Sequence, residues 1–510
     1  MSMPTAWAQF LNSEVSMRSI IILSFIFFAT NISTTGQEST ELIRRATVKI
    51  FNTYVKSNFC YPWKKKDTSS AVGSGAIIKG NLILTNAHVV SDSTFLQIQK
   101  ENDPTLYTAT VLYIGHSCDL ALLKVKKTSF FQGTHHLKIG EIPALRSKVY
   151  TYGYPKGGER ISITEGIVSR IEIGNYYHSN NSSLLRIQTD AAINSGNSGG
   201  PVIQNNRIVG VAFQARTDSS NIAYMIPTPI IKHFINDVHD GTYDDFPTLG
   251  ISASNMYNPH LRNYFGLSKK MSGILISIVY PGSSAYGLLK KDDILLALDN
   301  KKLANDGSVS FLKSRIKYTY IIDTKQVGEY ITATIFRNKK IKRIKIKLTA
   351  LTLRIPSHNT YETLPRYFIF GGIIFQPLSR EYLKCWNKWY YNADLRMIYY
   401  YMYQISDRVT PIRKEFVVIN QILPDPINTY LTSVKDVIVK SINGITIKSL
   451  KDLPSAFKKP RGKYHIIHIE GTTVPLVLPV TGISTADKRI QSKYNIPHLH
   501  QLKKNIRYRK

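Results

Sequence analysis

The sequence from residue 189 to residue 201 reads Thr-Asp-Ala-Ala-Ile-Asn-Ser-Gly-Asn-Ser-Gly-Gly-Pro, and it places Ser198 in a glycine-rich loop. A strand-like run, residues 184–188, leads into this loop. A serine hydroxyl is a poor nucleophile unless a base takes its proton and N–H groups bind the developing oxyanion. The glycines at 196, 199 and 200 permit a turn that aims N–H groups at one point. The same residues also make an ordinary hairpin turn, so the loop alone leaves both interpretations open.

Two more residues extend the pattern toward catalysis. His88 follows the apolar run 82–85, and Asp119 precedes the apolar run 120–123. Each has an ordinary structural explanation, a polar residue at a strand end or a turn aspartate. A serine hydrolase, however, needs a nucleophile, an imidazole base and a carboxylate that fixes the imidazole tautomer. The order His88, Asp119, Ser198 is that of chymotrypsin-like enzymes and differs from the orders in subtilisins and α/β-hydrolases. The three together predict a catalytic triad.

The runs around these residues resemble the three signatures of HtrA/Deg-type serine proteases: Thr-Asn-Ala-His-Val-Val (85–90), Asp-Leu-Ala-Leu-Leu (119–123) and Gly-Asn-Ser-Gly-Gly-Pro (196–201). Residues 246–251 resemble the start of a PDZ domain, and residues 372–378 are similar to plant-type Deg proteases with two PDZ domains. The resemblance covers roughly residues 42–480. It implies a mainly β fold, in which a chymotrypsin-like double β-barrel is followed by two PDZ-like α+β domains.

The expected organisation has five parts. We expect an N-terminal targeting region (1–36), a trypsin-like protease domain (42–240), a first PDZ domain (246–352), a PDZ-like domain (365–478) and a basic C-terminal tail (485–510). Short apolar runs separated by Gly, Asn and Pro predict the barrels. Helices are expected at 229–238, 285–289 and 449–457. The strands 416–423 and 436–444 repeat the pattern of 272–279 and 292–299, which indicates two diverged copies of one module.

The resemblance also implies residue roles. His88 acts as the base, Asp119 orients it, and the oxyanion hole is formed by Gly196, Asn197 and Ser198. Ala192 lies at the base of the substrate pocket, whose walls come from Val211, Ala212, Phe213, Ile222, Ala223 and Tyr224. Because the base carries no acid, we expect cleavage after small or medium apolar residues. In the first PDZ domain the carboxylate-binding loop is Thr248, Leu249, Gly250 and Ile251. No metal or organic cofactor is needed.

The net charge and the cysteines limit which binding partners and which disulfides the sequence predicts. The net charge is +32, and residues 337–347 fit a strand with one solvated lysine face. The basic tail is expected to be a solvated extension, with weak binding to anionic surfaces as the alternative. No nucleic-acid-binding module is present, so specific nucleic-acid binding is unsupported. Three widely spaced cysteines (60, 118 and 385) are read as core or free thiols.

The leading hypothesis is an ATP-independent serine endopeptidase of protein quality control that degrades unfolded proteins. By resemblance it assembles as a trimer or hexamer. A chaperone or scaffold with a resting protease site, and a basic peripheral binder, remain as alternatives. The apolar run 20–29 resembles a signal-peptide core, which predicts the secretory pathway or an organelle lumen; a leader for a mitochondrion or plastid is the alternative.

Overall fold

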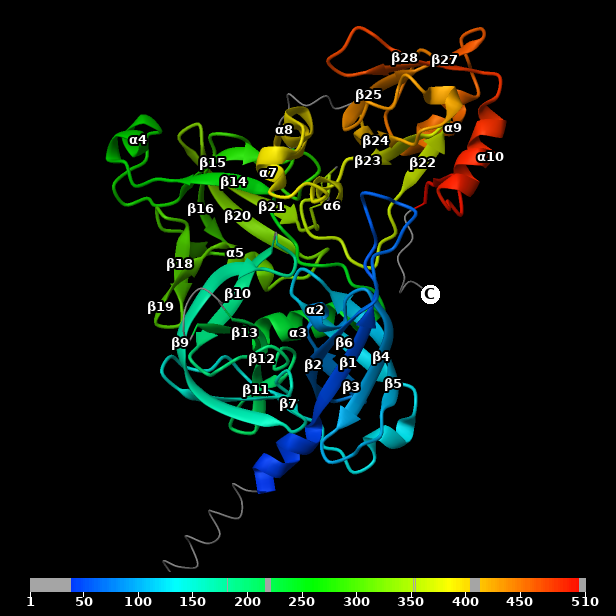
Figure 1. Ribbon diagram of the computed structural model, residues 1–510. Helices are drawn as coiled ribbons and strands as arrows, with labels where there is room; N and C mark the ends of the chain where they lie inside the picture. Colours follow the sequence, from blue (N-terminus) through cyan, green and yellow to red (C-terminus); the bar gives the residue numbers. More distant parts are fainter. Residues whose placement is uncertain are drawn as a thin grey trace, which may run out of the picture.

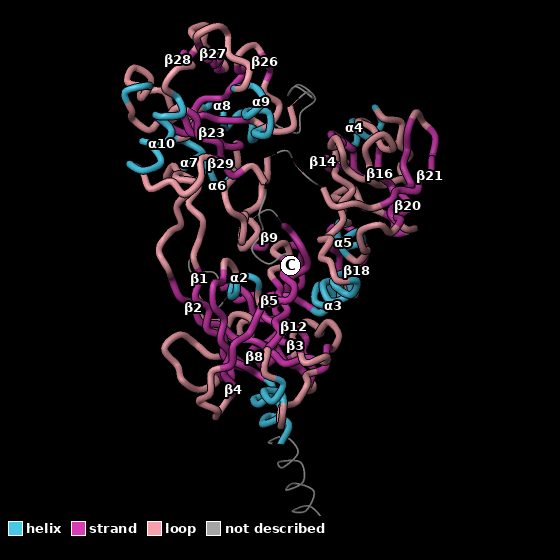
Figure 2. The backbone as a smooth tube through the Cα atoms, turned by 90° about the vertical axis from the view of Figure 1, so that its right-hand side faces the viewer, coloured by secondary structure: helices cyan, strands magenta, loops and turns pink. Residues whose placement is uncertain are grey.

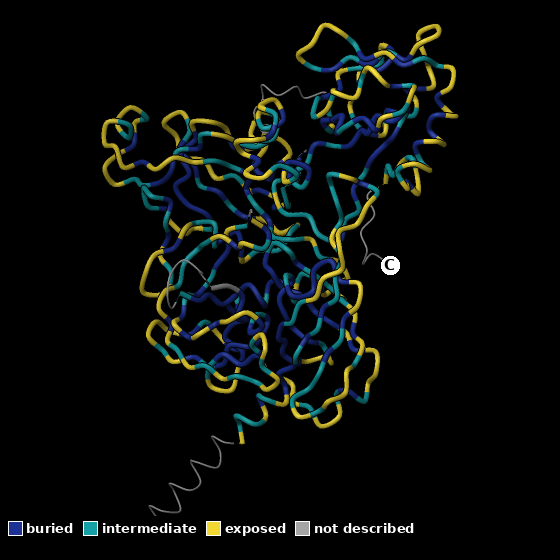
Figure 3. Tube along the Cα trace, viewed as in Figure 1, coloured by how far each residue is buried: buried dark blue, intermediate teal, exposed yellow. Residues whose placement is uncertain are grey.

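The computed structural model describes residues 38–180, 182–215, 222–351, 353, 355–403 and 413–503. The predicted targeting region, 1–36, lies outside this part. The chain forms two packed β-barrels, and two later sheets stand apart from each other above them (Figures 1 and 2). Figure 3 shows the buried residues concentrated in the barrels and in the strands of the two sheets.

The first barrel closes from six strands in the order β1-β2-β3-β6-β5-β4. A helix over residues 38–46 precedes it, and the one-turn helix α2 (Ala87–Val90) connects β3 to β4. Alternating apolar residues such as Val48, Ile50 and Ile98 fill its interior, as the period of a half-buried strand requires. The strands are β1 (Thr47–Tyr54), β2 (Ser69–Ile78), β3 (Leu82–Thr85), β4 (Ser93–Lys100), β5 (Tyr107–Gly115) and β6 (Leu120–Val125).

The second barrel is built from the order β11-β8-β9-β10-β13-β12-β7, and a β11–β12 pairing closes six of these strands into a ring. The predicted double barrel is therefore confirmed. The helix expected at 229–238 is present as α3 (Thr228–Asp237), which packs its apolar side on β12 and β13. The strands are β7 (Lys138–Ile139), β8 (Lys148–Gly153), β9 (Ser162–Tyr176), β10 (Ser182–Thr189), β11 (Pro201–Gln204), β12 (Arg207–Ala215) and β13 (Ala223–Pro227).

The first open sheet has the order β14-β15-β16-β20-β21, with β17 paired to β16. The prediction of a helix at 285–289 is wrong, because these residues form successive turns. The outer strand β21 exposes its lysines, as predicted. The elements are β14 (Ile251–Asn255), α4 (Pro259–Tyr264), β15 (Ile274–Val279), β16 (Ile294–Leu298), β17 (Lys301–Lys302), β18 (Ser308–Phe311), β19 (Ser314–Lys317), α5 (Thr319–Asp323), β20 (Tyr330–Arg337) and β21 (Lys340–Lys347).

The second open sheet repeats this order as β23-β24-β25-β27-β28, with β26 paired to β25. The predicted duplication is therefore visible in strand topology. Its strands are β22 (Tyr367–Phe370), β23 (Ile373–Pro377), β24 (Val417–Ile422), β25 (Val437–Ile442), β26 (Ile445–Thr446), β27 (Tyr464–Ile469), β28 (Leu476–Pro479) and β29 (His500–Gln501). The helices are α6 (Arg380–Leu383), α7 (Trp389–Asn392), α8 (Leu395–Tyr403), α9 (Leu453–Phe457) and α10 (Ile483–Lys493).

The two sheets differ at one edge. Strand β14 is the last strand of its sheet, whereas the equivalent strand β23 pairs with β22, and β22 in turn pairs with β29. Between β22 and helix α9, the Phe370 and Phe457 rings stack with centroids 3.9 Å apart. The edge that the first sheet leaves available for an added strand is therefore filled in the second sheet by the chain itself.

Two expectations need correction. Residues 485–501 are not a solvated extension, because α10 buries Ala486 and Ile490 and β29 joins the second sheet. Cys60 and Cys385 are not free thiols but a disulfide with a Cα–Cα distance of 5.8 Å. Their 325-residue separation gives no sequence signal for pairing. Cys118 is a buried free thiol, as predicted. Within the described ranges, no helix is long and apolar enough to cross a bilayer.

Candidate active site

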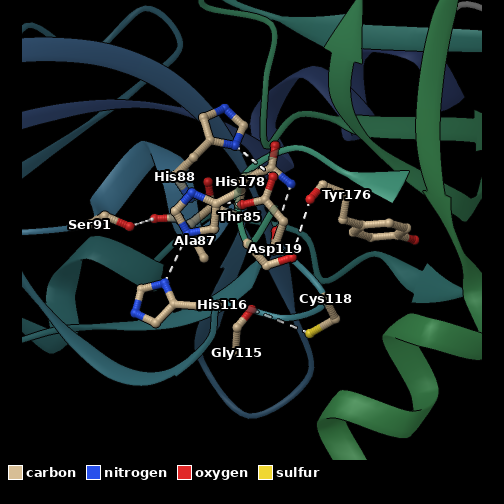
Figure 4. Close-up of polar contacts among 12 residues, drawn as sticks. Thr85, Ala87, His88, Ser91, Gly115, His116, Cys118, Asp119, Tyr176 and His178 are labelled. Atoms are coloured by element: carbon tan, nitrogen blue, oxygen red, sulfur yellow. Dashed lines mark hydrogen bonds and ion pairs between the residues drawn. The ribbon is translucent and has the colours of Figure 1, made fainter. Parts of the chain in front are cut away.

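The base and its carboxylate partner meet at the edge of the first barrel. His88 lies on helix α2, and Asp119 directly precedes β6. The Asp119 Oδ2 is 2.7 Å from His88 Nδ1, and Asp119 Oδ1 accepts the backbone N–H of His88 at 2.8 Å (Figure 4). Asp119 is 2% exposed, so both carboxylate oxygens are held away from water. This pair can fix the histidine tautomer in the manner that acyl transfer requires.

Asn86 also supports this geometry. The Asp119 backbone has φ +53°, a left-handed conformation that costs energy for a residue with a side chain. The fully buried Asn86 donates its side-chain N–H to the Asp119 carbonyl at 2.9 Å. Because Asn86 directly precedes α2, one side chain ties the histidine helix to the aspartate turn.

The nucleophile loop is fastened to the first barrel through Ser74. The Ser74 N–H donates to the Ser198 carbonyl at 2.9 Å, and the Ser74 hydroxyl donates to the Gly196 carbonyl at 2.7 Å. Gly199 has φ +85°, and a Cβ there would lie 2.2 Å from both the Ser74 carbonyl oxygen and Thr85 Oγ1. Only glycine fits this close approach. The contacts bring Ser198 beside the chain segment that leads into His88.

The predicted oxyanion hole lies in the same loop. Within the described residues, the backbone N–H groups of Gly196 and Ser198 donate to no acceptor, as expected for groups that await a substrate oxygen. The Asn197 backbone N–H instead donates to the Asn194 carbonyl at 3.0 Å, and the Asn197 side chain is buried. In this conformation Asn197 therefore supplies no N–H from its backbone. Between the described atoms of Ser198 and His88 there is no hydrogen bond, which is common in unliganded sites.

Electrostatics favour a charged base during the reaction. Burial lowers the pKa of His88, but the Asp119 charge and hydrogen bond outweigh this and raise it above its ordinary value of 6.5. Burial raises the pKa of Asp119, but the charge of His88, the charge that His178 carries at acidic pH and the two hydrogen bonds from His88 lower it overall. The aspartate is therefore ionised when the histidine accepts a proton. The nearby thiol of Cys118 is inert, because burial raises its pKa.

The predicted substrate-pocket residues divide into two groups. Ala192 is exposed, and its carbonyl accepts from the Thr164 hydroxyl at 3.1 Å. Ile222 is half-buried, and the predicted wall residues Val211, Ala212, Phe213, Ala223 and Tyr224 are buried. The predicted wall residues belong to the hydrophobic core of the barrel and the predicted base lies open to solvent, so the pocket assignment stays a prediction.

The predicted carboxylate-binding loop lies at the open edge of the first sheet. Gly250 has φ +64°, and a Cβ there would lie 2.2 Å from the Ser283 Cβ. The Gly250 N–H donates to Thr248 Oγ1 at 3.1 Å, and the Leu249 carbonyl accepts from Ala285 at 3.1 Å. This tight turn leads directly into β14, the strand whose outer edge is free within the described residues.

Comparisons with known proteins give the family. The family model of the trypsin-like peptidase domain matches residues 73–211, and a PDZ domain model matches residues 355–501. Over 410 residues, 80% of this chain and 76% of the relative, the sequence is 40% identical to Protease Do-like 4, mitochondrial, of Arabidopsis thaliana. The chain belongs to the HtrA/Deg family of trypsin-like serine proteases.

Other relatives of this Deg protease agree. This chain is 33% identical to Protease Do-like 2, chloroplastic, of Arabidopsis thaliana over 460 residues, which cover 89% of this chain and 74% of the relative. Among solved structures, an HtrA-type protease AlgW variant with decapeptide superposes with a TM-score of 0.50 at 21% identity. That alignment covers 62% of this chain and 97% of the other, and it supports the fold.

The sequence patterns did not identify several residues that contribute to the site. Ser74 stands in the run Gly73-Ser74-Gly75, whose flanking glycines were an available signal of close packing. His116, His178 and Glu362 lie near the triad, and they come from three distant parts of the chain. Nothing in their local sequence marks them as neighbours.

Proposed function

We propose that this Deg protease is an ATP-independent endopeptidase that cleaves unfolded proteins, with Ser198 as nucleophile, His88 as base and Asp119 as the group that orients the base. The observation that carries the proposal is the buried Asp119–His88 pair beside a serine loop whose two N–H groups have no acceptor within the described residues. His88 takes the Ser198 proton as the serine oxygen attacks a peptide carbonyl. It then gives the proton to the leaving amine, and water repeats the cycle to release the acyl group.

Substrate choice rests on the pocket. We assign Ala192 to the base of the pocket and the buried residues of β12 and β13 to its walls, which favours small or medium apolar side chains. Such side chains become accessible when proteins unfold. We assign the oxyanion contacts to Gly196 and Ser198.

Peptide recognition is assigned to the first PDZ domain. A peptide adds as a strand to an open sheet edge, and β14 offers this edge next to the loop 248–251. In the second PDZ domain β22 fills the equivalent edge. As in other members of the family we expect a trimer or hexamer. The names of its relatives, mitochondrial and chloroplastic, support an organelle as its location.

The test is degradation of casein without ATP by the chain from residue 37 onward, beside Ser198→Ala. We expect cleavage by the parent, ends at small apolar residues, and loss of about 10⁶-fold in turnover by the variant. If neither protein cleaves while both assemble and suppress aggregation, the chain acts as a chaperone, and the proposal fails.

A further inference from the structure

The linker between the two PDZ domains crosses the protease domain beside the triad. We call residues 357–363 the strap. Asn359 and Tyr361 both donate side-chain hydrogen bonds of 2.7 Å to the carbonyl of His178, which lies in the loop between β9 and β10. Farther along, the Thr363 carbonyl accepts from the Ser57 hydroxyl at 2.9 Å. A segment outside the protease domain is thus bonded to two of its loops.

Glu362 is buried and held by the loop that follows α2. It is 3% exposed, and its Oε1 accepts the Asp92 backbone N–H at 2.8 Å. Its own N–H donates to Asp92 Oδ1 at 2.8 Å, which makes the pair reciprocal. Asp92 lies two residues beyond α2, the helix that carries His88. Glu362 has φ +51°, a strained conformation that persists only where surrounding contacts hold it.

The second carboxylate oxygen of Glu362 begins a chain of side chains that ends beside the triad. Glu362 Oε2 is 2.6 Å from His116 Nε2, and His116 Nδ1 is 2.9 Å from His178 Nε2. Tyr361 stacks on both imidazoles, at centroid distances of 4.6 and 4.2 Å. The His178 ring lies 6.1 Å from the His88 ring (Figure 4). We call Glu362, His116 and His178 the relay.

Hydrogen-bonding capacity fixes the direction of the relay. A carboxylate only accepts, so His116 must donate from Nε2. The Nδ1 of a neutral His116 then carries a lone pair, and His178 must donate to it from Nε2. Only one arrangement of protons satisfies both hydrogen bonds when the imidazoles are neutral.

A neutral His178 matters because it faces the triad. Burial is the main cause that lowers its pKa to about 3; the Asp119 charge opposes this, while His116, His88 and Lys56 act in the same direction as burial. A charged His178 would compete with His88 for the negative charge of Asp119. When His178 is neutral, the negative charge of Asp119 stabilises only the His88 imidazolium.

We propose that Glu362 is a positioning residue for the protease reaction: through His116 it holds His178 in one tautomer against the Asp119–His88 pair, so the inter-PDZ linker completes the active site. The proposal rests on the Ser198 protease function proposed above. It does not make Glu362 a catalytic residue, because its contacts are with Asp92 and His116 and not with reacting atoms.

Glu362→Gln is the decisive variant because it keeps size but changes hydrogen bonding. The glutamine oxygen still accepts from Asp92, but its NH₂ then faces His116 Nε2 and forces both imidazoles into the opposite tautomers. The matched control is Glu415→Gln. Like Glu362, Glu415 accepts one backbone N–H, that of Leu450, and one side-chain N–H, that of Arg366, but it belongs to the second PDZ domain.

The assay is the rate at which a small alkyl fluorophosphonate labels Ser198, together with kcat and KM on a short peptide. In labelling, the serine oxygen bonds to phosphorus, fluoride leaves and His88 takes the proton. We expect Glu362→Gln to lower the labelling rate and kcat by about tenfold per active site, with KM unchanged and Glu415→Gln within about twofold of the parent. Active-site titration corrects for any inactive fraction.

An unchanged rate per active site in Glu362→Gln, or a change confined to KM, would overturn the proposal. If that variant does not fold, His178→Phe decides: it keeps a ring against Tyr361 but ends the relay, and a full parental rate would overturn the proposal. If Ser198→Ala were labelled as fast as the parent, that result would instead contradict the protease function itself.

Discussion

Asp119→Asn removes the group that sets the histidine tautomer, and its effect follows from two distances. The Asp119 oxygens accept from the His88 backbone N–H at 2.8 Å and face His88 Nδ1 at 2.7 Å. Asparagine has one acceptor oxygen and one NH₂ group. If the oxygen keeps the backbone N–H, the NH₂ faces Nδ1, and His88 must carry its proton on Nε2. An Nε2–H imidazole cannot take the Ser198 proton.

We therefore expect kcat to fall by about 10⁴, or about 5.5 kcal/mol of transition-state stabilisation, with little change in KM. The assay is kcat/KM on a short peptide as a function of pH, with circular dichroism to establish folding. In the parent, activity rises with pH through a His88 pKa that Asp119 holds above 6.5. In the variant that acid limb moves to lower pH, because the charge that raises the pKa is gone.

The matched control is Asp103→Asn, since the Asp103 carboxylate also accepts a backbone N–H, that of Thr105 at 2.9 Å, but lies on another turn of the same barrel. It should retain parental kcat. A folded Asp119→Asn that loses less than about tenfold in kcat, or keeps the parental acid limb, would refute the tautomer argument.

Three further predictions test the pocket, the peptide loop and the disulfide. Ala192→Asp should add cleavage after Lys and Arg, read by sequencing the product ends; cleavage that stays after apolar residues alone would remove Ala192 from the pocket base. Gly250→Ala should abolish binding of a fluorescent peptide with an apolar C-terminus, because its Cβ would meet Ser283, whereas Gly287→Ala, also at positive φ but with no atom within 4 Å of its Cβ, should keep it. Equal polarisation in the two variants would contradict the loop assignment. Cys60→Ser should lower the free energy of unfolding by about 2–4 kcal/mol, measured in denaturant without reductant; an unchanged midpoint would mean that the disulfide with Cys385 does not form in solution.

The parts that the sequence predicted are those with local patterns. The strands of both barrels follow from alternating apolar residues, and the short runs around His88 and Asp119 predicted the pair that the structure brings together. The role of Ser198 stays a prediction. The parts that it did not predict depend on contacts between distant residues. Ser74 reaches Gly196 across 122 positions, and Glu362 reaches Asp92 across 270. No periodicity carries such information, because only the folded chain brings the partners together.

The two PDZ copies differ in a way that follows from how each edge is used. The second copy fills its own edge with β22, and its other contacts lead back to the protease: Asn420 donates to the Cys60 carbonyl at 2.8 Å, and Cys385 is bonded to Cys60 itself. A module that closes its groove and is covalently joined to the protease is suited to bracing. A module whose β14 edge stays open is suited to sampling peptides. We therefore expect recognition to rest on the first sheet and support on the second, and the strap that joins them bonds to the loop that carries His178.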